Sequence, residues 1–197
     1  MAFNKTVRSA HEDKIYYLTQ DELKRFFSAI PKKDLRAHAI FTFMYRFGLR
    51  ISEAIILKES NIGSDGRIFI QRLKNGNSNY YKLSEEDRLL LERYVKSKEK
   101  NTEYIFSNHT EKNIAKSTIF RLYQKYAKKA GLPKDKCHPH CLRHSIAVHM
   151  LDAGLAIEDC QDWLGHRSIT NTMIYARISD KRRNATSDIV SQLPLMD

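Results

Sequence analysis

The chain has 197 residues, of which 42% are hydrophobic, enough for one domain with a sizeable core. Its 34 Lys and Arg residues outnumber 23 Asp and Glu residues, and the formal net charge of +11 favours a polyanionic partner over an acidic small substrate. Three cysteines cannot form a closed disulfide set, and neither a secretory leader nor an apolar run of ~20 residues is present. We therefore expect a cytoplasmic protein that does not enter the membrane.

The N-terminal third predicts a tail followed by helices. Residues 1–16 are polar and lack periodic apolar positions, which predicts a mobile tail. A helix is expected after Thr19, because a glutamate three residues later completes a capping box, and Pro31 ends this helix. A second helix is predicted over about 34–47, and a short third helix opens at Arg50.

A small antiparallel sheet is predicted in the middle of the chain. Strand-like alternation occurs at 67–73, at 79–83 and in a short stretch near Ile62. The dipeptide Asn75-Gly76 between the two longer segments is a strong signal for a hairpin. Lys74 is expected at the hairpin tip, where Arg72 and Lys82 are the neighbouring cations.

The rest of the chain predicts mostly helices. A helix capped by Ser84 is followed by predicted helices over about 116–130, 140–153, 157–164, 168–175 and 181–193. No linker or internal repeat divides the sequence. We expect one mainly α domain with a small antiparallel β-sheet (α+β) over residues 17–179, and a C-terminal tail or helix over 180–197.

A segment rich in histidine and cysteine begins the predicted helix at residue 140. On a helix, His140, Arg143 and His144 share one face, and a helix N-terminus also favours an anion, so this segment predicts a phosphate site. A zinc site is the alternative, because Cys137, His138 and Cys141 are also present, but their spacing does not resemble paired zinc knuckles. The three cysteines, which include Cys160, are better explained as packing residues.

Taken together, the motifs resemble the signature of the tyrosine recombinases, also called phage-type integrases. The matching elements are Gly48-Leu-Arg-Ile-Ser-Glu-Ala54, Lys74 on a hairpin, His140-x-x-Arg143-His144, Leu164-Gly165-His166, and Tyr175 nine residues after His166. They cover roughly residues 17–179 in the order of that family. The resemblance implies the fold of the family's catalytic domain and a site-specific DNA recombinase that needs no metal, ATP or other cofactor.

The resemblance also implies a role for each matching residue. Tyr175 would attack a DNA phosphodiester and form a 3′-phosphotyrosine, while Arg50 and Arg143 would hold the non-bridging oxygens. Guanidinium groups suit this role because they match phosphate in charge and geometry.

Three further matches would assist the reaction and two would support it. His140 and His166 would donate hydrogen bonds to the phosphate, and Lys74 would protonate the departing 5′-oxygen. Glu53 and His144 would hold the other residues in place.

The resemblance implies double-stranded DNA as partner, a homotetramer on synapsed DNA, and in some systems accessory DNA-bending proteins. Candidate DNA-binding cations are Lys112, Lys116, Arg121, Lys125, Lys128 and Lys129. Gln71-Arg-Leu-Lys-Asn-Gly76 and His138-Pro-His140 are most similar to the short single-domain invertases that switch fimbrial promoters. A non-catalytic DNA-binding regulator on the same fold and a type IB topoisomerase-like relaxing enzyme are the alternative functions.

Overall fold

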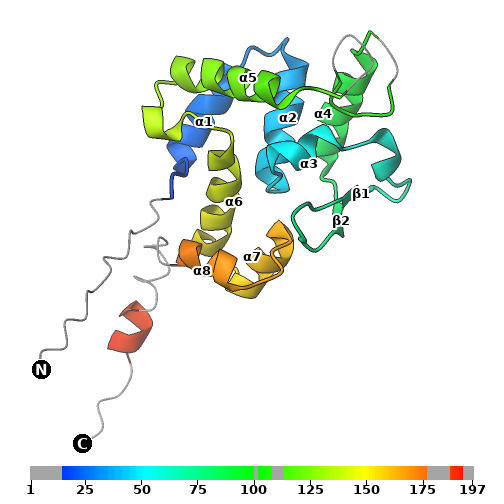
Figure 1. Cartoon of the computed structure of the whole chain (residues 1–197). Coiled ribbons are helices and arrows are strands. Elements are labelled where there is room, and N and C mark those ends of the chain that lie inside the picture. The colour runs from blue at the N-terminus through cyan, green and yellow to red at the C-terminus, as the bar shows by residue number, and fades with distance from the viewer. Residues whose placement is uncertain (1–14, 100–101, 108–112, 177–186, 193–197) are drawn as a thin grey trace, which may run out of the picture.

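The structure is a computed structural model that describes residues 15–99, 102–107, 113–176 and 187–192. It is mainly helical with one two-stranded antiparallel sheet (Figure 1). The helices are α1 (Gln20–Ala29), α2 (Leu35–Arg46), α3 (Ile51–Ile55), α4 (Glu85–Lys96), α5 (Lys116–Lys129), α6 (His140–Asp152), α7 (Ile157–Leu164) and α8 (Thr170–Ala176). Short 3-10 helices lie at Glu59–Asn61 and Lys134–Lys136, and the strands are β1 (Arg67–Ile70) and β2 (Asn79–Lys82).

The helix ends follow from local hydrogen bonding, and the bounds predicted for α1 to α8 agree to within one or two residues, while the helix predicted over 181–193 lies largely outside the described residues. The Thr19 hydroxyl accepts from the backbone N–H of Glu22 at 3.2 Å, and the Glu22 carboxylate accepts from the N–H of Thr19 at 2.8 Å, which confirms the predicted capping box. The side chain of Ser84 caps α4 in the same way, by accepting from the N–H of Asp87 at 3.1 Å.

The hairpin is shorter than the sequence predicted. β1 pairs with β2 from Arg67 opposite Lys82 to Ile70 opposite Asn79, so the connection is formed by residues 71–78 instead of the predicted residues 74–78. The ladder stops because the backbone N–H of Arg72 donates to the side chain of Ser78 at 3.0 Å, not to a backbone carbonyl across the hairpin. The predicted strand near Ile62 is also absent, since Ile62 makes only an isolated bridge with Ile68.

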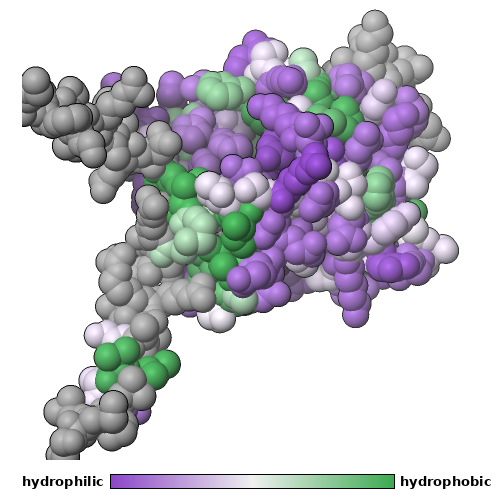
Figure 2. All heavy atoms as spheres, turned by 60° about the horizontal axis from the view of Figure 1, so that its bottom comes forward, coloured by the Kyte–Doolittle hydropathy of each residue, from purple (hydrophilic) through white to green (hydrophobic). Residues whose placement is uncertain are grey.

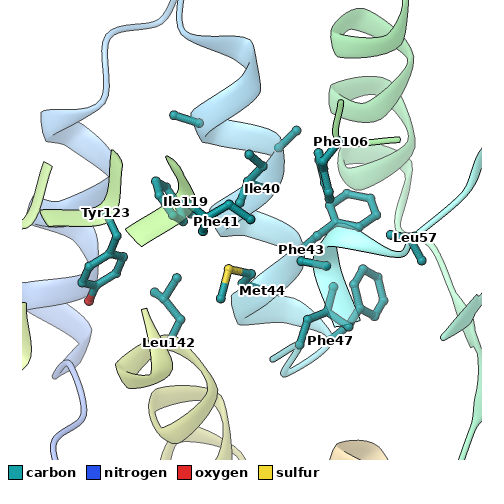
Figure 3. Close-up of a cluster of buried hydrophobic side chains, with 14 of the residues drawn as sticks. Ile40, Phe41, Phe43, Met44, Phe47, Leu57, Phe106, Ile119, Tyr123 and Leu142 are labelled. Carbon is teal, nitrogen blue, oxygen red and sulfur yellow. The ribbon is translucent and has the colours of Figure 1, made fainter. Parts of the chain in front are cut away.

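The main hydrophobic core is built around α2. Figure 3 shows Ile40, Phe41, Phe43, Met44 and Phe47 of this segment pointing into a cluster that also receives Phe106, Tyr123 and Leu142. These side chains are 0–2% exposed. Apolar residues occur on several faces of α2, and this explains why the helix is buried among its neighbours.

Helix α6 connects this core to a second, smaller one. Its first turns belong to the main cluster through Cys141 and Leu142, while Ala147, Val148 and Leu151 pack against α7 and α8. The catalytic candidates of α6 lie where the two clusters meet. Helix α6 therefore places its polar residues between the two hydrophobic clusters.

Much of both predicted tails lies outside the described residues. At the N-terminal end, Ile15 and Tyr16 are half-buried and pack against the two hydrophobic clusters, so the packed fold begins before the predicted boundary at residue 17. At the C-terminal end, residues 187–191 are helical and exposed. Within the described ranges, no helix has the length and apolar character required to cross a bilayer.

Candidate active site

Arg50 lies at the start of α3, just after the turn that ends α2. Its backbone N–H donates to Oε2 of Glu53 at 2.9 Å, and its Nη1 donates to Oε1 of the same carboxylate at 2.6 Å. These two bonds fix the first turn of a helix that is too short to be stable alone. The Arg50 side chain remains 22% exposed, so its guanidinium can still reach an anion.

The carboxylate of Glu53 is the centre of a buried cluster of arginines. It also accepts from Nη1 of Arg72 at 3.2 Å and from the backbone N–H of Leu73 at 3.2 Å, and Nη1 of Arg143 lies 3.9 Å away. Burial alone would raise the pKa of Glu53, but the Arg50 backbone bond and the charges of Arg72 and Arg143 outweigh burial and lower it below 4.5. Three guanidinium groups face one carboxylate, which leaves two positive charges uncompensated.

Arg143 joins the ends of two helices. It is 1% exposed, its Nη2 donates to the carbonyl oxygen of Leu164 at 2.9 Å, and its Nη1 donates to the carbonyl oxygen of Gly48. Burial, with the nearby charges of Arg50 and Arg72, lowers the pKa of Arg143 to about 10, so it stays protonated at neutral pH. Its position is therefore set by backbone atoms on both sides.

His166 follows Gly165, which ends α7 in the left-handed conformation with a φ of 65°. The residue is 7% exposed, and Nδ1 forms a 2.9 Å hydrogen bond with the hydroxyl of Thr172. Burial and the charges of Arg143 and Arg50 lower the pKa of His166 to about 3, so the ring is neutral at pH 7. When Thr172 donates to Nδ1, the ring proton is on Nε2, which can donate to a phosphate oxygen.

Tyr175 on α8 is buried, with 2% of the residue exposed. Its hydroxyl is 2.9 Å from Nδ1 of His144, and burial raises the pKa of Tyr175 to about 12 although Arg143 opposes this. Burial and the charge of His140 lower the pKa of His144 to about 3, so its neutral ring can accept the phenolic proton in a hydrogen bond. The sequence predicted His144 as a supporting residue, and the structure places it directly against the phenol.

The two remaining candidates lie at the edge of the site. His140 begins α6, is exposed, and has its ring centroid 4.4 Å from that of His144 at an interplanar angle of 88°. Desolvation of the His140 ring by the surrounding protein atoms and the charge of Arg143 lower the pKa of His140 to about 4. Lys74 is exposed at the hairpin turn, with a positive φ of 56°. Figure 1 shows the hairpin connection beside α7, the helix that leads to His166.

The sequence did not identify Arg72 as part of the site, only as a cation near Lys74. In the structure its side chain is fully buried and donates to the carbonyl oxygens of Phe47 at 2.8 Å and Trp163 at 2.7 Å, in addition to Glu53. Period-two alternation from Ile68 and Ile70 places residue 72 on the buried face of the strand. That alternation is the signal by which the sequence could have revealed it.

Two other groups of candidate residues, those of the alternative zinc site and those expected to bind DNA, do not join this cluster. Cys141 contacts His138 with its sulfur 3.3 Å from Nε2, but among the described residues no three His, Cys, Asp or Glu side chains converge as a metal site would require. The basic residues predicted to bind DNA are exposed on α5, at the end of the fold away from α7 and α8 (Figure 1). They are Lys116, Arg121, Lys125, Lys128 and Lys129; Lys112 lies outside the described residues.

A tyrosine beside buried guanidinium and imidazole groups provides the kinds of side chain that transfer of a phosphoryl group to a phenol requires. The chain belongs to the phage integrase family, which matches residues 16–182. Tyrosine recombinase XerA from Pyrococcus furiosus is 33% identical over 168 residues, which is 83% of this chain and 58% of that protein. The putative integrase/recombinase y4qK from Sinorhizobium fredii is 34% identical over 179 residues, which is 90% of this chain and 57% of that protein. This chain thus spans somewhat over half the length of these relatives.

Solved structures have the same fold. A crystal structure of XerA recombinase superposes with a TM-score of 0.76 at 30% identity, covering 96% of this chain and 66% of the other. XerH recombinase bound to its palindromic difH substrate gives a TM-score of 0.78 at 21% identity, covering 94% of this chain and 56% of the other. These matches confirm the predicted recombinase catalytic-domain fold. The special similarity to fimbrial invertases stays a prediction.

Proposed function

We propose that this chain carries the catalytic centre of a site-specific DNA recombinase that cuts and rejoins DNA through a 3′-phosphotyrosine at Tyr175. One observation carries the proposal: Arg50 and Arg143 lie in a cluster with two uncompensated positive charges, and His166 and Tyr175 are held beside it. Membership in a family with named tyrosine recombinases supports the same reaction.

The proposed chemistry uses only side chains of this chain and water. The Tyr175 phenol releases its proton to water and its oxygen attacks phosphorus, the bond from phosphorus to the 5′-oxygen breaks, and Lys74 gives a proton to that oxygen. Arg50 and Arg143 bind the non-bridging oxygens, whose negative charge grows as phosphorus becomes pentacoordinate. Reversal by a 5′-hydroxyl restores a phosphodiester with one bond made for each bond broken, so rejoining needs no ATP.

We propose double-stranded DNA and further copies of this chain as partners, in a homotetramer on synapsed DNA. Lambda integrase, a structural neighbour at 19% identity, has been solved as a tetramer bound to a Holliday junction. Figure 2 shows hydrophobic residues gathered in one region of the face turned forward, and the exposed apolar residues of the chain include Leu155, Met173 and Ile174. Such a patch suits contact with another subunit.

We further propose that residues 180–197 are exchanged between subunits and that the reaction takes place in the cytoplasm.

Covalent trapping on DNA tests the reaction. A library of nicked suicide substrates should yield a protein–DNA adduct with the wild-type chain and none with Tyr175→Phe. Tyr104→Phe serves as a matched control, because Tyr104 lies elsewhere, beside Lys58. Adduct formation by Tyr175→Phe, or none by the wild-type chain with any substrate, would overturn the proposed function.

A further inference from the structure

The backbone hydrogen bonds between β1 and β2 are too few to fix the tip of the hairpin that carries Lys74. The ladder ends at Ile70 and Asn79, and Lys74 and Asn75 both have positive φ angles, 56° and 59°. Residues other than glycine rarely adopt this backbone conformation, and it persists where surrounding contacts impose it. The contacts that hold the tip must therefore come from outside the sheet.

Arg72 supplies most of these contacts. Its Nη2 donates to Phe47 O at 2.8 Å, to Trp163 O at 2.7 Å and to the Tyr81 hydroxyl at 3.0 Å, and its Nη1 donates to Glu53. One guanidinium thus ties the hairpin to the end of α2, to the end of α7 and to the carboxylate that holds Arg50. A planar group with five donors can make such a set of bonds, and an ammonium cannot.

The hairpin backbone is docked on the same elements. The N–H of Asn77 donates to the carbonyl oxygen of Gly165 at 3.0 Å, and the N–H of Leu73 donates to Glu53. A Cβ at Gly165 would lie 2.6 Å from Asn77 O and 2.7 Å from Cγ of Arg72, so this approach requires glycine. The residue after Gly165 is His166, so the hairpin rests directly against the part of the site that carries the histidine.

We propose that Arg72 is the positioning residue for Lys74: its guanidinium locks the hairpin onto the ends of α2 and α7, and so holds the lysine ammonium at a fixed place beside the arginine and histidine cluster. Arg72 itself is buried and does not touch the DNA. The inference rests on the proposed role of Lys74 as proton donor to the departing 5′-oxygen.

A change of leaving group separates positioning of the proton donor from other effects. In a DNA whose scissile 5′-oxygen is replaced by sulfur, the departing thiolate needs no proton, because a thiol has a pKa of about 8.5, far below that of an alcohol. Lys74→Ala should cleave oxygen DNA about 10²–10⁴-fold more slowly than wild type and sulfur DNA at a rate near wild type.

Arg72→Lys is the variant that tests the inference, since it keeps the buried charge and loses the fork of hydrogen bonds. We expect cleavage of oxygen DNA to slow by about 10²-fold, the effect of a misplacement of ~1 Å, and cleavage of sulfur DNA to stay near wild type. Arg67→Lys is the matched control on the same hairpin, where Arg67 is exposed and pairs with Asp65, and it should be unchanged on both substrates.

Two results would overturn the inference: an equal loss of Arg72→Lys on both substrates, or no loss on oxygen DNA. If Arg72→Lys does not fold, Tyr81→Phe decides, because it removes only a hydroxyl that bonds Arg72 and Trp163 O. Its loss should be smaller and confined to oxygen DNA, and an equal loss on both substrates or no loss would contradict the role of Arg72. Absence of the Tyr175-dependent adduct in the wild-type chain, or failure of sulfur to rescue Lys74→Ala, would instead refute the proposed function or its proton donor.

Discussion

Replacement of Glu53 by Gln tests the electrostatic centre of the site. The substitution keeps the size of the side chain but removes the charge that faces Arg50, Arg72 and Arg143. Loss of one partner from a buried ion pair costs about 3–5 kcal/mol, because the remaining charge is buried and uncompensated. For a chain of this length about 2–4 °C corresponds to each kcal/mol, so the melting temperature should fall by roughly 6–20 °C.

The assay is thermal unfolding of wild-type and variant chains at neutral pH, with Glu92→Gln as control. Glu92 pairs with Arg88 on the surface of α4, where both side chains are more than 40% exposed, and such a pair contributes about 0.3–0.5 kcal/mol. The control should therefore melt within ~2 °C of the wild type. Equal shifts for Glu53→Gln and Glu92→Gln would refute the view that Glu53 organises the arginines.

The effect of Glu53 should also depend on pH in a defined direction. The pKa of Glu53 in the folded chain lies below 4.5, so the folded state binds this proton less readily than the unfolded state. The stabilisation is then complete above pH 4.5 and is lost as the pH falls through the folded pKa. The difference in unfolding free energy between wild type and Glu53→Gln should shrink in that acidic range, and a difference that grows on acidification would contradict the assignment.

Two further predictions concern the turn after α7 and the buried histidines. Gly165→Ala should lower the free energy of unfolding, measured in urea, clearly more than Gly154→Ala does. At Gly154 the left-handed conformation alone costs about 1–2 kcal/mol, whereas at Gly165 a Cβ would also meet atoms within 3 Å. Equal losses for the two variants would contradict this prediction. The ring NMR signals of His144 and His166 should not shift between pH 8 and pH 5, because both pKa values are about 3. The free energy of unfolding should fall as the pH drops below about 6.5, because the unfolded chain then binds protons that the folded chain does not. Titration of either ring near pH 6.5 in the folded chain would refute the burial of these histidines as neutral rings.

Local features of the fold could be predicted from the sequence, because their causes lie within a few residues. The capping box at Thr19 and the end of α7 at Gly165 depend only on residues close by in the sequence, and both are found where predicted. The hairpin connection was predicted too short, because the N–H of Arg72 bonds the Ser78 side chain instead of the facing strand, and long-range contacts hold the Arg72 guanidinium. Arg72 reaches carbonyl groups of residues 47 and 163, and no pattern near position 72 specifies those partners.

The candidate site was predicted as a set of residues but not as an arrangement. The family signature gives Arg50, Arg143 and Tyr175 because side-chain type and order are written in the sequence. Burial depends on how α8 packs against α6, so neither the 2% exposure of Tyr175 nor its bond to His144 could be read from spacing. The alternation of Ile68 and Ile70 could have revealed that Arg72 is buried, but its partners could not be predicted, since they come from separate segments of the chain.

The burial of Tyr175 determines what the described arrangement can do before it meets its target. Its phenol faces the ring of His144 inside the protein, so in this arrangement its oxygen cannot approach a phosphorus atom on a passing duplex. A cutting-competent arrangement with the phenol turned outward would be a minority species, and minor states are commonly populated at about 0.1–10%. A partner that binds this species more tightly raises its population. Strand breakage would then depend on assembly of the correct complex.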